Sequence, residues 1–157
     1  MSKKIYIISL ITFILDQISK AIISTYLTLG KSIKLIKDFF YLTYIHNTGA
    51  SWGILKNNTT LLIILSIIAL IILIRYSNSF KNTKLNVCGL GFLMWGILGN
   101  LADRILYGYV IDFFDFYIFN YDFPIFNIAD IFIVIGVILL IISIVRGEDK
   151  DGSNSSK

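Results

Sequence analysis

The sequence predicts an all-α membrane protein with four transmembrane helices and a small β-sheet and loop region at the membrane surface. Two observations support this fold class. Hydrophobic residues make up 56% of the 157 residues and charged residues only 15%, which departs strongly from the composition of soluble domains. Apolar stretches long enough to cross a bilayer recur along the chain, and lysines and arginines stand near their ends. The net charge of +4 therefore fits membrane orientation better than nucleic-acid binding, and no nucleic-acid partner is expected.

The apolar stretches differ in their flanking residues. Two lysines precede the first, as in a signal peptide, but no small-x-small cleavage site follows and the run continues past Asp16, so we expect a retained helix. Glycines in the third allow close helix packing, and Pro124 stands near the start of the fourth, where proline is tolerated. Residues 1–146 are expected to form one membrane domain, and residues 147–157 a disordered cytoplasmic tail. The expected spans are residues 5–23, 59–76, 85–106 and 124–145.

The stretches between the spans are expected to lie on the membrane surface. Residues 33–45 are rich in Phe, Tyr, Ile and Thr with partial alternation, which predicts short strands. Residues 47–53 supply turn-forming and small residues, including Gly49, that let the backbone approach a ligand closely. Residues 107–123 are expected to form a second, aromatic-rich surface loop. His46 is interpreted as a surface or turn residue, since a single histidine makes no metal site without partners.

Four spans place both termini on one side of the membrane. The termini and the loop of residues 75–84 carry more lysines and arginines than the opposite loops, which predicts that both termini are cytoplasmic. Polar side chains then collect at the opposite, extracytoplasmic ends of the helices. Because ionisable groups at membrane depth are costly, this convergence predicts a functional site there. The converging residues are Asp16, Lys20, Asn47, Asn100, Asp103, Arg104, Asp112, Asp115, Asn127 and Asp130.

Three kinds of chemistry suit such a site. Two carboxylates in a partly desolvated site cannot both ionise easily, so one keeps its proton and the pair can act as general acid and base. Alternatively, Asp103, Asp112 and Asp115 could hold Mg²⁺ for phosphotransfer on a lipid, although the Asp-Gly…Ala-Arg opening of membrane CDP-alcohol transferases is missing. A small transporter with carboxylate proton carriers is the third, although such carboxylates usually lie near the midplane.

Nucleophilic catalysis by a side chain is a poor explanation of this sequence. Its one histidine and its one cysteine lie on different segments, so no Ser/His or Cys/His pair is plausible, and the sequence has no His/Cys cluster for zinc. Cys88 sits inside an apolar run, where a small core residue is the simpler interpretation. A single cysteine also excludes an internal disulfide. Once side-chain nucleophiles and zinc are set aside, acid–base chemistry by aspartate remains as the enzymatic mechanism to weigh against the Mg²⁺ and transporter alternatives.

Four sequence blocks together resemble lipoprotein signal peptidase, the bacterial signal peptidase II family. They occur in the family's order and cover most of the chain up to Gly136; one departure is Ser51, where the family more often has alanine. The blocks are Asp16-Gln17-Ile18-Ser19-Lys20, Asn47-Thr48-Gly49-Ala50-Ser51-Trp52-Gly53, Gly99-Asn100-Leu101-Ala102-Asp103-Arg104 through Gly108-Tyr109-Val110-Ile111-Asp112-Phe113, and Phe126-Asn127-Ile128-Ala129-Asp130.

The resemblance implies a membrane aspartic endopeptidase with a small outer β-sheet. It implies removal of signal peptides from diacylglyceryl-modified prolipoproteins by cleavage before the lipidated cysteine, at the extracytoplasmic face of the bacterial cytoplasmic membrane. Asp112 and Asp130 match the catalytic pair, whereas Asp115 has no assigned role and is expected to be a solvated loop charge. No metal or other cofactor is expected, the partners are prolipoproteins and membrane lipids, and we expect a monomer. Substrate-binding or supporting roles fall to Asp16, Lys20, Asn47, Gly49, Asn100, Asp103, Arg104 and Asn127.

Overall fold

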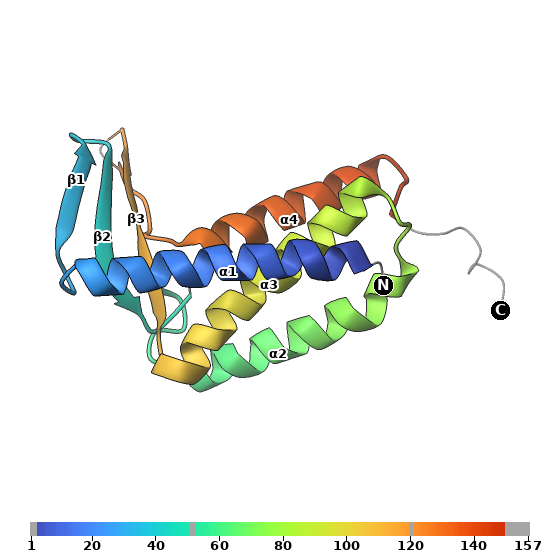
Figure 1. Ribbon diagram of the computed structural model, residues 1–157, viewed down its shortest axis with the longest axis horizontal. Coiled ribbons are helices and arrows are strands. Elements are labelled where there is room, and N and C mark those ends of the chain that lie inside the picture. The colour runs from blue at the N-terminus through green and yellow to red at the C-terminus, as the bar shows by residue number, and fades with distance from the viewer. Residues whose placement is uncertain (1–2, 51–52, 120, 150–157) are drawn as a thin grey trace.

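Four long helices lie side by side, and a small antiparallel sheet crosses one end of them (Figure 1). The computed structural model describes residues 3–50, 53–119 and 121–149. The helices are α1 (Lys3–Tyr26), α2 (Thr59–Tyr76), α3 (Lys84–Tyr107) and α4 (Ile128–Val145), and each is long and apolar enough to cross a membrane. The strands are β1 (Ser32–Ile36), β2 (Phe40–Asn47), β3 (Val110–Ile118) and β4 (Tyr121–Asp122), paired in that order.

Each expected span corresponds to one helix, but the start of the fourth was predicted wrongly. Pro124 precedes α4, which begins at Ile128 because Asn127 caps it. The Asn127 side chain accepts a hydrogen bond from the backbone N–H of Asp130 at 3.0 Å, and the Asp130 carboxylate accepts one from the backbone N–H of Asn127 at 3.1 Å. This reciprocal capping box satisfies donors that a helix start otherwise leaves unpaired, and it fixes both side chains at the sheet end of the bundle.

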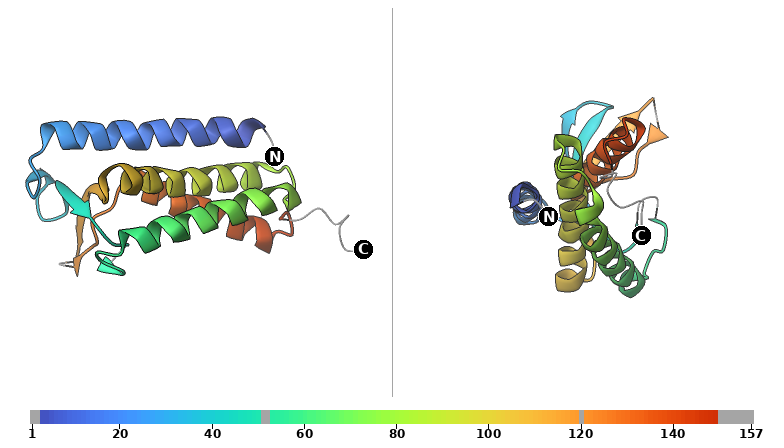
Figure 2. Two further views of the ribbon diagram at one scale, coloured as in Figure 1. Left: turned by 90° about the horizontal axis from the view of Figure 1, so that it is seen from below. Right: turned by 90° about the vertical axis from the view of Figure 1, so that its right-hand side faces the viewer.

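Helix α3 is the centre of the bundle. Figure 2 shows α1 on one side of it and α2 and α4 on the other. The seam between α3 and α4 depends on glycine, as expected: a Cβ at Gly96 would lie 2.5 Å from the carbonyl oxygen of Ala129, and one at Gly136 would lie 2.7 Å from the backbone nitrogen of Leu93. Small residues therefore let the two backbones approach closely, as they do in membrane helix pairs.

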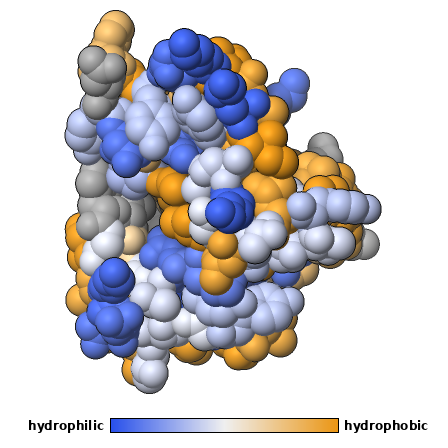
Figure 3. Space-filling view, turned by 90° about the vertical axis from the view of Figure 1, so that its left-hand side faces the viewer, coloured by the Kyte–Doolittle hydropathy of each residue, from blue (hydrophilic) through white to orange (hydrophobic). Residues whose placement is uncertain are grey.

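The outward faces of α1, α2 and α4 are apolar. Ile7, Ile64 and Ile138 are typical, each about half exposed in the isolated chain. Such exposure of aliphatic side chains is costly in water and favourable in lipid, so it fits the helices' membrane-spanning length. The end of the molecule that carries the sheet differs: its surface is largely hydrophilic with apolar patches between (Figure 3).

The segment after α3 is a strand, which corrects the expectation of a surface loop at residues 107–123. Strand β3 pairs with β2 on one side and with β4 on the other. Ile111 and Phe113 are buried in a cluster with Ile23 of α1 and Tyr44 of β2. The strand therefore lies against the helices, and it carries its polar residues into the interior of the protein.

Two further expectations change with this strand. Asp115 is only 4% exposed and accepts a hydrogen bond from the Thr43 hydroxyl, so it is not a solvated loop charge. His46 belongs to β2 and is half-buried rather than part of a turn: its ring stacks on Tyr109 with 3.6 Å between ring centroids, and its Nε2 lies 2.8 Å from the Tyr44 hydroxyl. Burial lowers the pKa of His46 below its usual value.

Candidate active site

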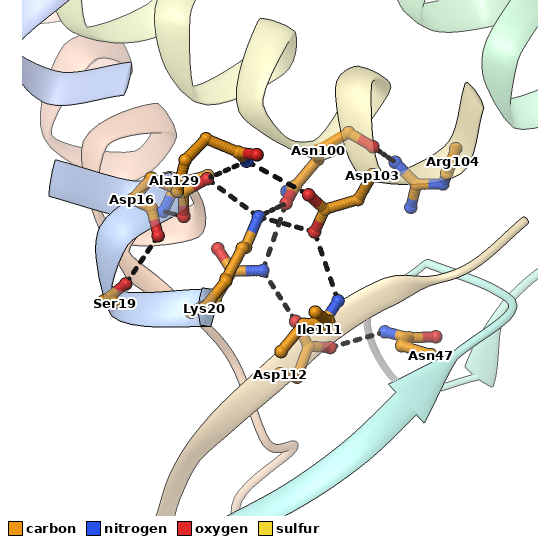
Figure 4. A network of polar contacts seen from close by, with 12 residues as sticks. Asp16, Ser19, Lys20, Asn47, Asn100, Asp103, Arg104, Ile111, Asp112 and Ala129 are labelled. Carbon is orange, nitrogen blue, oxygen red and sulfur yellow. Dashed lines mark hydrogen bonds and ion pairs between the residues drawn. The ribbon is translucent and has the colours of Figure 1, made fainter. Parts of the chain in front are cut away.

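The expected catalytic pair and the eight residues expected to support it lie in one continuous network of polar contacts at the sheet end of the bundle. Figure 4 shows the part of this network around Lys20, Asn100 and Asp112. Helices α1, α3 and α4 contribute through their ends near the sheet, and strands β2 and β3 contribute from the sheet itself. The segments are far apart in sequence, and each brings one to three of these polar side chains to the same layer. The structure thus brings together the residues predicted to converge except Asp115, whose carboxylate bonds to Thr43.

Asp112 of β3 is buried and held by two amide groups. Its Oδ2 accepts a hydrogen bond from Nδ2 of Asn47 at 2.8 Å, and its Oδ1 accepts one from Nδ2 of Asn127 at 2.6 Å. Burial, followed by the negative charge of Asp130, raises the pKa of Asp112 from 3.8 to about 7, against the opposing effect of the two amide donors. The Asp112 carboxyl is thus placed to hold or release a proton near neutral pH.

Asp130 occupies the first turn of α4 and also has two donors. Its Oδ1 accepts a hydrogen bond from Nδ2 of Asn100 at 2.8 Å, and its Oδ2 accepts the backbone N–H of Asn127 that completes the capping box. Negative charge at a helix N-terminus is favoured by the helix dipole. Asp130 and Asp112 line the same cavity, of about 230 Å³, with Asn47, Asn100 and Arg104 and with apolar side chains from α2, α3 and α4.

Beside this cavity lies a buried ion cluster around Lys20. Its Nζ is 2.8 Å from Asp16 and 2.9 Å from Asp103, and all three side chains are at most 2% exposed. The two carboxylates also reach other elements: Oδ1 of Asp16 accepts the backbone N–H of Ala129 at 3.0 Å, and Oδ2 of Asp103, which also pairs with Lys20, accepts that of Ile111 at 3.2 Å. The cluster therefore ties α1, α3, α4 and β3 together at the level of the two cavity carboxylates.

Gln17 also belongs to this cluster, and the sequence had not marked it. Its Nε2 donates to Asp16 at 3.1 Å and to Asp103 at 3.0 Å. A neutral side chain in an apolar helix gives no charge signal. Its place directly after Asp16, in the same short block that matches the family, was the one available clue.

Arg104 connects α3 to the loop that follows β2. Its Nη2 donates to the carbonyl oxygen of Gly49 at 2.9 Å, and its Nη1 donates to that of Asn100 at 3.4 Å. Gly49 in turn donates its N–H to Oδ1 of Asn47 at 2.9 Å. A Cβ at Gly49 would lie 2.9 Å from the carbonyl oxygen of Ile54, so only glycine fits this turn. The last part of the predicted 47–53 stretch includes residues 51–52, which lie outside the described residues.

The three aspartates of the Mg²⁺ alternative are not brought together. Asp103 is paired with Lys20. Asp115 is three residues from Asp112 along β3, which places the two on opposite faces of the strand, and its carboxylate bonds to Thr43. Within residues 3–50, 53–119 and 121–149, no group of three or more His, Cys, Asp or Glu side chains is arranged to hold a metal ion. The geometry favours a pair of carboxylates over a metal cluster.

Comparison with known proteins agrees with this geometry. A family model described as "Signal peptidase (SPase) II" matches residues 8–146. The lipoprotein signal peptidases of Staphylococcus aureus strains JH9 and Newman are each 42% identical to this chain over 165 aligned positions, which cover 100% of this chain and 98% of the relative.

Two solved bacterial membrane enzymes have the same fold. One, determined by the in meso method at 2.3 Å resolution, superimposes with a TM-score of 0.83 at 41% identity and covers 98% of this chain and 92% of its own. The other, at 1.9 Å resolution, gives a TM-score of 0.81 at 42% identity and covers 90% of this chain and 92% of its own. The chain therefore belongs to the signal peptidase II family of lipoprotein signal peptidases, which are membrane-embedded aspartic endopeptidases.

Proposed function

We propose that this enzyme removes the signal peptides of diacylglyceryl-modified prolipoproteins, cutting before the lipidated cysteine, with Asp112 and Asp130 as the catalytic pair. One observation carries the assignment of the pair: the two carboxyl groups line one cavity, Asp112 buried and Asp130 half-buried, and are each held by two donors. Two carboxyl groups in such a site share one proton, because ionising both places like charges together without water.

The shared proton suggests a division of roles. One carboxyl group of the pair carries it: burial raises the pKa of Asp112 to about 7, and ionising both groups would place like charges together. The ionised partner takes a proton from a water molecule as that water attacks the scissile carbonyl carbon. The protonated partner gives its proton to the carbonyl oxygen. When the C–N bond breaks, the leaving nitrogen receives the proton taken from water, and one hydroxyl of the tetrahedral intermediate returns a proton to the pair as the new carboxyl group forms.

Arg104 and the asparagines are proposed to hold the peptide. Nε of Arg104 is buried and has no hydrogen-bond partner among the described residues, although the side chain lines the cavity. A buried donor left unpaired is costly, so a carbonyl oxygen of a bound peptide would satisfy it. The amide nitrogens of Asn47 and Asn100 each donate one hydrogen bond within the network, so each has a second N–H to offer a peptide carbonyl.

A second, apolar cavity is proposed to accept substrate lipid. It has a volume of about 330 Å³ and opens beside Asp130. Its remaining walls come from the segment before α4 and from the first half of α4, through Phe123, Pro124, Ile125, Phe126, Ile131, Val134 and Ile135. An acyl chain there would be anchored within reach of the carboxylate, so that the lipidated residue and the scissile bond are positioned together.

The proposed orientation puts the site outside the cell. The start of α1 and the end of α4 lie at the end of the bundle away from the sheet (Figure 1). Lysine and arginine are enriched in the terminal sequences and in the 75–84 loop, which favours a cytoplasmic location for that end. We also propose a monomer, because every residue of the network comes from one chain. A cysteine introduced at exposed Lys34 in a Cys88→Ser background should react with an impermeant thiol reagent in intact cells; reaction only after lysis would invert the orientation.

The activity is tested with purified enzyme in detergent and a diacylglyceryl-modified prolipoprotein. Mass spectrometry of the products should show a cut directly before the lipidated cysteine, and the unlipidated precursor should remain uncut. The rate should be the same with and without EDTA, because proton transfer between carboxyl groups needs no cation. Asp38→Asn, a matched change at an exposed aspartate, should behave as wild type. Strict dependence on Mg²⁺ or a cut elsewhere would contradict the proposal.

A further inference from the structure

Lys20 has one contact that charge pairing does not explain. It is the largest fully buried side chain among the described residues. Asp16 and Asp103 already supply more than enough negative charge for its ammonium. Its third partner is neutral: Nζ donates to Oδ1 of Asn100 at 3.1 Å. Asn100 is also the residue that donates to Asp130, so the ammonium is one side chain away from the cavity carboxylates.

This contact decides which way the amide of Asn100 faces. An ammonium group can only donate hydrogen bonds, so the amide oxygen must face Lys20. The amide nitrogen then faces the other way, toward Oδ1 of Asp130 at 2.8 Å. If the amide were reversed, its nitrogen would meet the ammonium, a repulsive contact between two donors. Its oxygen would meet the carboxylate of Asp130, which would also be repulsive unless Asp130 took up a proton.

The same oxygen of Asn100 also orients the donor to Asp112. It accepts a second hydrogen bond, from Nδ2 of Asn127 at 3.0 Å, and that nitrogen donates to Oδ1 of Asp112 at 2.6 Å. Oδ1 of Asn127 is held separately by the capping box. Each amide nitrogen is therefore directed at one carboxyl group, and the oxygen that faces Lys20 is common to both connections.

We propose that Lys20 is a positioning residue for the catalytic pair: by fixing the amide of Asn100, and through it that of Asn127, it keeps a hydrogen-bond donor directed at each carboxyl group. It touches neither the reacting atoms nor the cavity that holds them. The inference rests on the proposed function of Asp112 and Asp130. It adds that α1 controls the protonation of these two residues, although α1 contributes no residue to the cavity.

The surrounding charges predict the direction of the pH effect. The charged groups that face the network are Asp16 and Lys20 from α1, Asp103 and Arg104 from α3, Asp112 from β3 and Asp130 from α4. The positive charge of Lys20 opposes the rise in the pKa of Asp112. Removing that charge also releases the amide donors that Lys20 orients. Both changes make the ionised forms of Asp112 and Asp130 less favourable. The pH–rate profile should then move toward higher pH.

Lys20→Met tests the role directly, because methionine keeps most of the length and none of the charge. We expect kcat to fall about 10²-fold while KM for the lipidated precursor changes little, since misplacing catalytic groups affects turnover rather than binding. The optimum of the pH–rate profile should rise by about 1 pH unit. A merely structural loss would lower the active fraction and leave the profile where it was, and that result would overturn the proposal.

Two additional variants keep the test decisive. Lys20→Met leaves two buried carboxylates unpaired, which destabilises a protein strongly, so the same profile is measured in Lys20→Met/Asp103→Asn against Asp103→Asn alone. The rise in the pH optimum caused by Lys20→Met should persist in this comparison. If neither Lys20 variant folds, as judged by thermal unfolding in detergent, Lys20 is needed for folding itself and the positioning role is wrong.

The connection through Asn100 is tested by combining variants. If Lys20 acts through that amide, Lys20→Met/Asn100→Ala should be no slower than Asn100→Ala within about twofold, because residues that act as one unit are not additive. Losses that multiply would overturn the proposal. Asp112→Asn and Asp130→Asn are assayed in parallel: if they are active, the proposed function itself fails, whereas if they are inactive and the losses still multiply, only the role of Lys20 fails.

Discussion

Polar side chains are buried at both ends of the helix bundle, but the two ends use them differently. At the sheet end, side chains bond mainly to other side chains (Figure 4). These contacts lead to the carboxyl groups of Asp112 and Asp130. At the end that carries the termini, Asn86 is 1% exposed and donates to two backbone carbonyls, those of Lys81 at 3.0 Å and Glu148 at 2.7 Å. Among the described residues, no ion pair forms at that end.

The difference shows that burial alone does not identify a functional site. The hydrogen-bond partners of the buried side chains distinguish such a site from a purely structural contact. Asn86 joins the loop before α3 to the chain after α4, where it pairs the otherwise unpaired carbonyl of Glu148, and it needs no ligand for this. The carboxylates at the sheet end instead face a cavity and keep acceptor capacity free for a ligand. Both ends are connected by the same helix, since α3 begins two residues before Asn86 and ends three residues after Arg104.

The largest expected effect is at the sheet end. Asp112→Asn and Asp130→Asn should each reduce turnover by at least about 10²–10⁴-fold, because asparagine keeps the shape but cannot exchange a proton at working pH. Binding of the lipidated precursor, measured by co-purification, should persist. Asp115→Asn is the control from the same strand: its carboxylate bonds to Thr43 on the opposite face, and the variant should keep substantial activity. An inactive Asp115→Asn with active Asp112→Asn would move the site to the other face of β3.

Replacing Arg104 at the sheet end of α3 should affect activity much more than replacing Arg75 at the opposite end of the bundle, in α2. Arg104→Ala removes a buried donor set that holds Gly49 and lines the cavity, and it should lower kcat/KM by about 10²-fold. Arg75→Ala removes an exposed side chain in the last turn of α2, at the opposite end, and should change kcat/KM less than about twofold. Equal, small effects would mean that Arg104 only anchors the helix end.

Stability should depend on pH through Asp112. Its pKa is raised from 3.8 to about 7 in the folded state, so the folded protein binds this proton more tightly than the unfolded chain. The stabilisation is complete below pH 3.8 and is lost as pH rises through about 7. The melting temperature of wild type in detergent should therefore fall between pH 4 and pH 8 more than that of Asp112→Asn. Parallel curves for the two proteins would contradict the raised pKa.

Changing the buried asparagine at the other end should affect stability alone. Asn86→Leu leaves the carbonyl of Glu148 without a donor and removes one of two donors to that of Lys81, and it should cost about 1–3 kcal/mol of unfolding free energy. Turnover per folded molecule should be unchanged, as measured by active-site-normalised kcat. A loss of kcat with wild-type stability would show that the end carrying the termini also takes part in catalysis.

The smallest effect is expected at Cys88, which is half-buried in α3 away from the network. Cys88→Ser should keep activity within about twofold, because the change is nearly isosteric. A folded but inactive Cys88→Ser would instead indicate thiol chemistry.

The sequence was sufficient for the helices and for the convergence of their polar ends. Long apolar runs define helices at membrane depth almost without competition, and once four spans alternate in direction, residues such as Asp16 and Asp103 must fall at the same end. Asn127 and Asp130 stand three apart, which is also the spacing of a capping box. That pattern explains why α4 starts at Ile128, whereas the apolar run alone predicts a span that begins at Pro124.

Strand β3 and the buried state of Asp115 could not be read from local pattern. The strand is covered on both faces over residues 110–113, so hydrophobic and polar residues do not alternate there, and a continuous aromatic run is ambiguous. Asn86 was missed for another reason. Its partners are backbone carbonyls, which carry no signature in the sequence, whereas charged side chains at membrane depth are conspicuous by their cost.

The central claim is that Asp112 and Asp130 act as one unit on the substrate. The most direct measurement is single-turnover cleavage of a diacylglyceryl-modified prolipoprotein by wild type, Asp112→Asn, Asp130→Asn and the double variant, each shown to be folded by thermal unfolding. If the two carboxyl groups share one catalytic proton, the double variant should be slower than either single variant by no more than about threefold. If the two losses multiply, or if either single variant cleaves at close to the wild-type rate, the two aspartates do not form the catalytic pair.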